Sequence, residues 1–251
     1  MKKTLLVFAA MGLCLLSAPA FALIEVEGFY WLMQPAGDVS FGGEGEEGTG
    51  LDLEGDLGFD SAERIPGFKL AIGDVHQIGI GYFSMDIEAD STMTENVRFG
   101  DAVFFEGTDV TSTWEGDIVQ GFYRLNLGSS SARYGLLAGG MFIDFTAAME
   151  SEGGRSSQSS KAIMPYVGGY FMGYPVSWGG VRGSVLASTW DWGDVTATML
   201  DIELAGEVVF TPGVYVAAGY RHTGIDATFE DDNVDIDVTF SGPIVYLGFE
   251  W

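Results

Sequence analysis

The segment from Val234 to Trp251 constrains the fold more than any other, because apolar residues occupy alternate positions along its length. Counting back from Trp251, every second residue as far as Val245 is apolar, which gives a β-strand one apolar face. From Val234 to Phe240 the apolar residues stand at the other parity, and acidic or hydroxyl residues alternate with them. A strand that stays regular therefore exchanges its apolar face partway along, and any fold for this chain has to accommodate that reversal.

The alternate apolar residues that end at Phe249 and Trp251 resemble the C-terminal strand of bacterial outer-membrane β-barrels, which typically end in Phe or Trp. The resemblance implies that these residues face lipid and that those between them face the lumen. It also implies that Phe249 and Trp251 act as the assembly signal for the barrel-assembly machinery. Outer-membrane lipid and lipopolysaccharide are the further partners that it implies.

Residues 1–22 have the features of a secretory signal peptide: Lys2 and Lys3, then an apolar run, then an A-x-A cleavage site that ends at Ala22. The apolar run is too short for a membrane-spanning helix. The chain's one cysteine, Cys14, follows a leucine, whereas a lipoprotein signal needs a small residue there. We therefore expect an exported protein, localised to the bacterial outer membrane, whose mature part contains no thiol or disulfide.

The composition favours a single folded domain over residues 23–251. The formal charge of -25 becomes -27 when the two signal-peptide lysines are removed, which excludes nucleic acid as a natural partner. A content of 47% hydrophobic residues argues against disorder. Abundant glycine and aromatic residues without a second long apolar run fit a transmembrane barrel, because alternation dilutes its apolar residues.

Ten strands are predicted, with short turns on one side and long polar loops on the other. They span 24–35, 65–73, 76–89, 110–127, 133–149, 162–173, 176–192, 195–210, 214–229 and 234–251. The long loops are 36–64, 90–109 and 150–161. The fold class is thus all-β, a transmembrane antiparallel up-and-down barrel of about ten strands, with both termini on the periplasmic turn side. A barrel of eight strands stays open as the alternative if the weak second and sixth segments are misread.

The reversal of apolar face recurs in most of these strands. In the third strand, the face that carries Ile78 and Tyr82 near the turn carries Asp86 and Glu88 near the loop. One explanation is a set of regular strands whose loop-side part projects above the outer leaflet, since spanning takes roughly 9–11 tilted residues. The alternative is a β-bulge in each strand, for example at Gly224. Regular strands are favoured because one cause then explains every reversal.

On the turn side, the lumen is predicted to hold acids and bases together. These residues are Glu25, Glu27, Lys69, Arg124, Arg133, Arg182, Asp201, Glu203, Glu207, Arg221 and Glu250. Charges cut off from bulk water need partners, so a salt-bridged plug is one interpretation and a gated polar pore is the other. Ten strands leave a lumen that side chains nearly fill.

On the loop side, the lumen is predicted to be apolar. The candidate ligand-binding residues are Phe29, Trp31, Met33, Phe83, Met85, Trp114, Met141, Phe145, Trp190, Trp192, Met199, Phe229 and Phe240. They form either a packed core or a pocket for a small hydrophobic molecule, because Met beside aromatic residues suits adaptable apolar binding. This zone resembles the small barrels of the OmpW-like/OmpA-like superfamily, some of which carry hydrophobic compounds, although those have eight strands.

The first long loop is acidic and glycine-rich. Its carboxylates are Glu44, Glu46, Glu47, Asp52, Glu54, Asp56 and Asp60. Their spacing does not match a calcium-binding EF-hand loop, so a solvated loop is predicted, with weak Ca²⁺ or Mg²⁺ bridging to lipopolysaccharide as the alternative. No cofactor and no metal site are predicted.

Catalysis is not predicted. Outer-membrane omptin proteases and lipid A deacylases use histidine, and this chain has His76, beside a predicted turn, and His222, which is followed by Thr223 rather than by a deacylase His-x-Ser motif. Neither has a convergent nucleophile or base in the sequence pattern. Three functions remain: binding or passage of small hydrophobic molecules, a structural or surface-interaction barrel with a solid lumen, and low-conductance ion passage.

Overall fold

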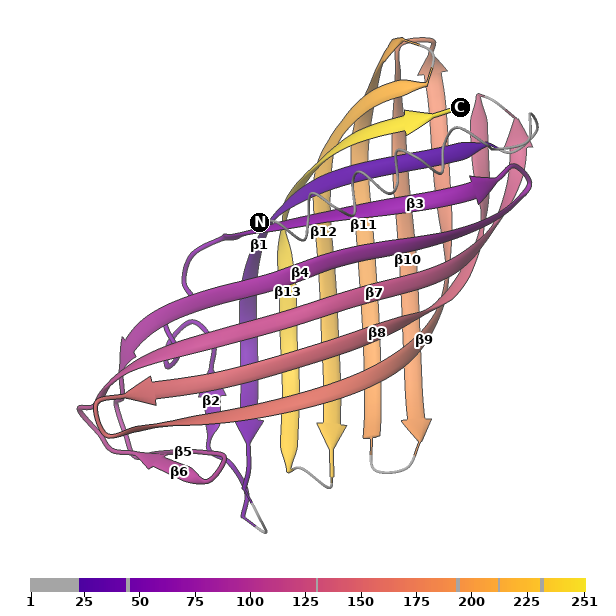
Figure 1. Cartoon of the computed structure of the whole chain (residues 1–251). Coiled ribbons are helices and arrows are strands. Elements are labelled where there is room, and N and C mark those ends of the chain that lie inside the picture. Colours follow the sequence, from indigo (N-terminus) through magenta and orange to yellow (C-terminus); the bar gives the residue numbers. More distant parts are fainter. Residues whose placement is uncertain (1–22, 44–45, 130, 193–194, 212, 231–232) are drawn as a thin grey trace, which may run out of the picture.

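A computed structural model describes residues 23–43, 46–129, 131–192, 195–211, 213–230 and 233–251 (Figure 1). The predicted signal peptide, residues 1–22, lies outside this part of the chain. Among the described residues, no helix is long and apolar enough to cross a membrane.

The fold is a closed antiparallel barrel of ten long strands, which confirms the predicted fold class and excludes the alternative of eight. The barrel strands are β1 (Ile24–Phe41), β3 (Glu63–Gly73), β4 (His76–Thr92), β7 (Asp109–Ser129), β8 (Ala132–Ser151), β9 (Gly154–Val176), β10 (Gly179–Trp192), β11 (Val195–Thr211), β12 (Val214–Phe229) and β13 (Val234–Glu250). Each pairs with the next, and β13 closes the barrel on β1. The short strands β2 (Gly50–Asp52), β5 (Val97–Phe99) and β6 (Ala102–Phe104) lie in the long connections.

Every strand keeps one parity inward along its length. In β13 the even-numbered residues from Val234 to Tyr246 lie inside, and the ladder that pairs β13 with β12 runs from end to end without a register shift. The register shifts found among the described barrel strands lie at Gly179/Val181 and Val209/Thr211, beside the short turns. The bulge predicted as the alternative at Gly224 is therefore absent, and the reversal of apolar face occurs along regular strands.

The outer surface of the barrel changes from apolar to polar between the turn side and the loop side. An apolar belt surrounds the turn-side half of the barrel, with side chains such as Ile78, Leu136, Leu204 and Leu247 between 50% and 66% exposed. On the loop side the outward positions are polar; Asp86 and Glu88 of β4, for example, are exposed. A belt of this kind is the lipid-facing feature of transmembrane barrels.

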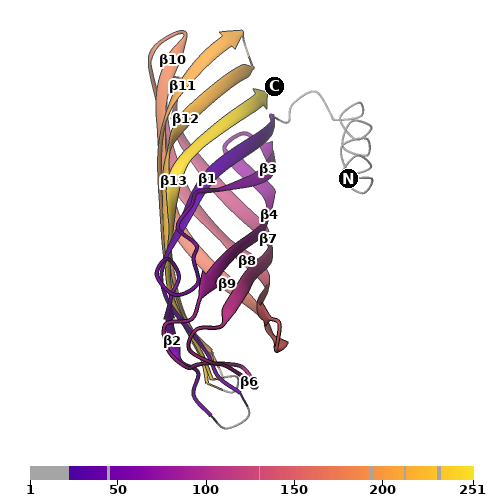
Figure 2. The same cartoon turned by 90° about the vertical axis from the view of Figure 1, so that its left-hand side faces the viewer.

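On the loop side, the wall of the barrel divides into two sheets. Pairing of β3 with β4 ends at Gly67 and Phe83, and pairing of β9 with β10 ends at Val167 and Ala187. Beyond those points β4, β7, β8 and β9 continue as one sheet, while β10 to β13 and β1 continue as another. Figure 1 shows the first set crossing the second at an angle, and Figure 2 shows the same two sheets from the side.

The first two long connections form a cap over the loop side, which corrects the prediction of a simply solvated loop. Apolar side chains of these connections are buried in the core: Leu51, Leu53, Leu57, Phe59, Met93, Val97, Phe99 and Phe104. The Phe99 ring lies 4.8 Å from the Phe41 ring, and Gly100 N donates to Phe41 O at 2.8 Å. The acidic side chains of Asp52 and Glu54 are exposed as expected, whereas Glu44 lies outside the described residues. The loop is thus polar outside and apolar underneath.

Candidate functional site

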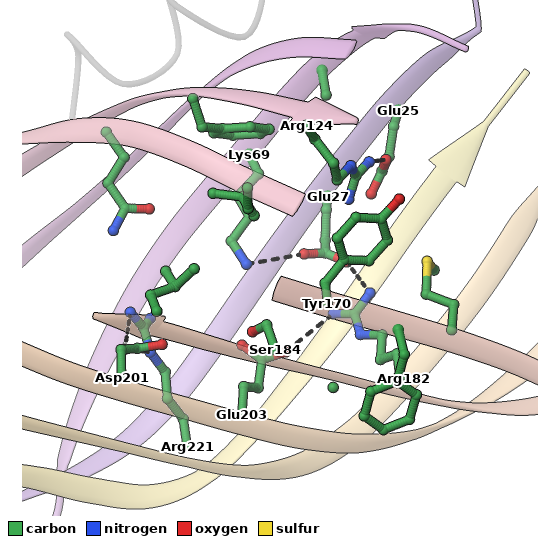
Figure 3. A pocket seen from close by; sticks show the side chains of 18 of the residues that line it. Glu25, Glu27, Lys69, Arg124, Tyr170, Arg182, Ser184, Asp201, Glu203 and Arg221 are labelled. Carbon is green, nitrogen blue, oxygen red and sulfur yellow. Dashed lines mark hydrogen bonds and ion pairs between the residues drawn. The ribbon is translucent and has the colours of Figure 1, made fainter. Parts of the chain in front are cut away.

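The turn-side lumen contains a buried network centred on Glu27 and Arg182 (Figure 3). Glu27 Oε2 accepts hydrogen bonds from Arg182 and, at 2.9 Å, from the Tyr215 hydroxyl, while Lys69 Nζ lies 3.7 Å from Glu27 Oε1. Arg182 Nη2 also lies 3.8 Å from Glu203 Oε1. These residues come from five different strands, β1, β3, β10, β11 and β12, so the network joins opposite walls of the barrel.

A second ion pair lies closer to the loop side. Asp201 on β11 and Arg221 on β12 are both almost completely buried, and Arg221 Nε and Nη2 each lie 2.8 Å from Asp201 Oδ2. The Thr223 hydroxyl donates to the same oxygen at 2.5 Å. The Arg221 guanidinium stands over the Trp31 ring at 4.8 Å, in the range of a cation–π contact. This pair therefore connects the polar network with the aromatic zone above it.

The charged side chains at the end of the network nearest the chain termini are also paired. Arg124 forms an ion pair with Glu25 and donates from Nε to Gln77 Oε1 at 2.6 Å. Arg133 Nη1 lies 2.6 Å from Glu250 Oε1. The acids and bases predicted for the turn-side lumen take inward positions, and a cavity of about 110 Å³ remains among them, lined by all except Arg133, Glu207 and Glu250. The geometry agrees with the salt-bridged plug.

Inward-facing tyrosines take part in this network, and the sequence interpretation did not assign them that role. The hydroxyl of Tyr246 donates to Glu203, that of Tyr215 to Glu27, and that of Tyr174 to Glu207 Oε1 at 2.9 Å. Strand parity had placed Tyr246 on the lumen face, although without this role, and could have placed Tyr215 there too. On β9 it could not distinguish the two faces, since both carry aromatic residues.

The loop-side lumen contains a cavity of about 240 Å³. The candidate residues that line it are Trp31, Met33, Phe83, Met85, Trp114, Met141, Phe145, Trp190, Met199, Phe229 and Phe240. Phe29 is buried but lies closer to the network, 5.8 Å from the Tyr246 ring and 6.2 Å from Phe83. The side chain of Trp192 lies outside the part of the chain that the structure describes. The zone therefore contains space that a fully packed core would lack.

The cavity has an apolar wall and a polar floor. Gln120, Asp201 and Arg221 line this cavity and also the smaller one below it, so they form the boundary between the two. Trp31 is 2% exposed, and its indole N–H has no hydrogen-bond acceptor among the described residues. Buried donors are almost always paired, so this N–H is an exception, and its nitrogen is itself inaccessible from the cavity.

Neither histidine lies in these cavities. His76 is exposed beside the turn and its Nδ1 lies 2.6 Å from the Tyr123 hydroxyl, and His222 is exposed on the outer face of β12. Within the described residues, no group of three or more His, Cys, Asp or Glu side chains could hold a metal ion.

No protein-family model and no curated protein sequence matches the chain. Among solved structures, it is similar to the outer-membrane protease OmpT from Escherichia coli, with a TM-score of 0.61 and 11% identity over 91% of this chain and 97% of that one. It is also similar to the transport unit of the autotransporter AIDA-I from Escherichia coli (TM-score 0.40, 9% identity, 92% and 90% covered). The Pseudomonas putida toluene transporter TodX gives a TM-score of 0.27 and 10% identity, with 92% and 90% covered. The last two likenesses are too distant to carry an argument.

The likeness to OmpT extends to the fold alone. It shows, with the closed ladder of ten strands, that the chain has the architecture of an outer-membrane β-barrel. Membership of the OmpW-like/OmpA-like superfamily is not shown and stays a prediction.

Proposed function

We propose that this chain is a protein of the bacterial outer membrane that binds small hydrophobic molecules in its loop-side lumen and passes them on. The observation that carries the proposal is the cavity of about 240 Å³ lined by aromatic, methionine and aliphatic side chains. A cavity of about 150 Å³ lined by apolar side chains can hold benzene, so this one is large enough for a molecule of one or two rings. Met85, Met141 and Met199 give its wall conformational freedom.

The experiment is a titration of the folded protein in detergent with toluene, phenol, cyclohexanone and an alkane, followed by tryptophan emission. Trp114→Phe and Trp31→Phe identify signals from the cavity, and Trp178→Phe serves as the control because Trp178 is exposed beside a short turn. A saturable change that the control retains and the cavity variants lose supports the proposal. Emission that no compound alters contradicts it.

A structural or surface-interaction barrel without transport is the second candidate. It is supported by the closure of the lumen at both ends, by paired charges on the turn side and by the cap on the loop side. The same titration separates the two candidates, because a purely structural barrel shows no saturable binding.

We further propose that the protein is not an enzyme, and that its C-terminal strand is recognised by the barrel-assembly machinery through Phe249 and Trp251. Both side chains point outward, and Trp251 N and O exchange hydrogen bonds with Ile24 at 3.0 and 2.7 Å, at the seam where the barrel closes. Replacing both residues with alanine should reduce the amount of protein assembled in the membrane without changing the fold of refolded protein. Lipid and lipopolysaccharide would contact the apolar belt.

A further inference from the structure

We propose that the ligand exchanges between the loop-side cavity and the outer leaflet of the membrane sideways, through the separation between β9 and β10. This inference rests on the proposed function, because it assigns a route to the same cavity.

The ladder between β9 and β10 ends in the middle of both strands. Its last pair is Val167 and Ala187; beyond it, β9 pairs with β8 alone and β10 with β11 alone. The Ser188 hydroxyl donates to Pro165 O at 2.6 Å, just beyond the last pair. Proline has no N–H to contribute to a ladder and occurs in sheets at edges. Figure 1 shows β9 leaving β10 here to run with β8.

The residues that line the cavity show that it extends into this separation. A strand that forms a closed wall contributes alternate residues, as β7 does with Trp114, Gly116, Ile118 and Gln120. Among the described strands, β9 alone contributes consecutive residues, from Ser160 to Met164. A cavity can contact both faces of a strand only by passing around its edge, so the cavity reaches the unpaired edge of β9.

The corresponding separation between β3 and β4 is closed by the cap. Leu53 and Leu57 are completely buried there, and the Phe59 ring lies 5.6 Å from that of Trp114. Gly58, at φ +80°, lies against β4 so closely that a Cβ would come within 2.6 Å of Asp90 O. The cap therefore blocks one side of the cavity and leaves the β9–β10 side as the route.

Along the barrel axis, the separation between β9 and β10 begins at the height where the apolar belt ends. The outward residues around its beginning are apolar, with Ile163 66%, Val167 64% and Val185 48% exposed. Farther toward the loops, the outward residues Lys161, Thr189 and Asp191 are polar and exposed. An apolar molecule dissolved in the outer leaflet would meet the opening at the lipid–water interface. Movement along the barrel axis is blocked by the cap above and by the Asp201–Arg221 pair below.

The experiment compares two reversible locks, because the chain without residues 1–22 has no cysteine. The lateral lock is Ile163→Cys with Asp191→Cys, which would be partners if the ladder continued, joined by a reducible bis-methanethiosulfonate linker chosen as the shortest that reacts. The cap lock is Asp38→Cys with Asp52→Cys, which are cross-strand partners of β1 and β2, oxidised to a disulfide. Each protein, purified from membranes into lipid nanodiscs, is mixed with vesicles that contain 1-aminoanthracene, and the saturable energy transfer from tryptophan is followed in time.

We expect the lateral lock to slow both uptake and release at least tenfold while the dissociation constant changes less than twofold, and reductant to restore the rates. The cap lock should change the rates less than twofold. A cap lock that slows exchange while the lateral lock does not would overturn the lateral route, as would two locks without effect. If the unlocked proteins show no saturable binding, the proposed function itself fails, which is distinguishable from failure of the route.

Discussion

The two halves of the lumen are enclosed by the same strands, yet they are filled in opposite ways. On the turn side, buried carboxylates and guanidinium groups are held by directional contacts such as the pair between Glu27 and Arg182, and a cavity of about 110 Å³ remains. On the loop side, apolar side chains line a cavity of about 240 Å³. Charges removed from water require partners, so their geometry is tightly defined, whereas an apolar wall can enclose a void that a ligand fills.

The outer surface explains why the two halves differ. Successive side chains of a strand point to opposite faces, so a wall that shows apolar residues to lipid has its other residues in the lumen. Where the wall projects into water, the polar residues face outward and the apolar residues must be inside. One regular pleat thus produces a polar interior at one level and an apolar interior at the next.

The largest expected effect comes from breaking the turn-side network. Arg182→Met should destabilise the barrel by about 3–5 kcal/mol, because it leaves the buried Glu27 carboxylate without its closest cation. Arg155→Met is the matched control, since Arg155 pairs with Glu150 at 3.4 Å on the surface and should cost about 0–1 kcal/mol. Unfolding in urea, followed by tryptophan emission in detergent, measures both. If both variants lost the same free energy of unfolding, the buried turn-side network would not stabilise the barrel more than a surface ion pair does.

The division of the outer surface into an apolar belt and a polar loop-side zone can be tested on one strand. Leu204 and Thr198 both point outward from β11, but Leu204 lies in the apolar belt and Thr198 lies on the loop side. Leu204→Arg should destabilise the protein in lipid vesicles by about 2–4 kcal/mol, the cost of a cation at the bilayer midplane, and Thr198→Arg by about 0–1 kcal/mol. If both variants were equally stable, the belt would not be the membrane-facing zone.

The difference in packing between the two halves of the lumen can be tested by replacing one alanine with phenylalanine in each half. Ala197 lines the loop-side cavity and Ala217 lies in the packed turn-side half, 3% and 1% exposed. Ala217→Phe should cost about 1–3 kcal/mol through overpacking. Ala197→Phe should cost less, because the new ring enters the void, and should weaken ligand binding at least tenfold. Binding that survives Ala197→Phe unchanged would place the ligand elsewhere.

The smallest expected effect concerns the point where β9 and β10 separate. Ser188→Ala removes the hydrogen bond to Pro165 O and should lower the free energy of unfolding by about 1 kcal/mol. It should also raise the ligand exchange rate in nanodiscs, because the strands are then held together at that point by packing alone. Thr189→Ala is the control, since Thr189 points outward on the same strand. An exchange rate lower than that of the unmodified protein would contradict this role of Ser188.

Alternation in the sequence was sufficient to predict the closed barrel of about ten strands and the inward-facing parity of most strands. It succeeded because a strand's two faces follow from parity, and because the reversal near Phe240 and Asp86 occurs without bulges. The same reasoning failed for the first long loop, whose carboxylates are conspicuous while Leu53 and Leu57 appear as isolated leucines. Without a strand or helix period, nothing in the sequence indicates that such residues are buried.

The pattern of residues is therefore informative about local features: which residues form strands, where they turn, and which face each side chain takes at each level. The extent of pairing between neighbouring strands, the covering of the loop side and the space left inside depend on how the whole barrel packs. Pro66 and Pro165 mark both separations, yet other strand prolines, such as Pro35, lie within a continuous ladder. A cavity is a small difference between the volume that the strands enclose and the volume of the side chains inside, so it depends on the positions of all the strands at once.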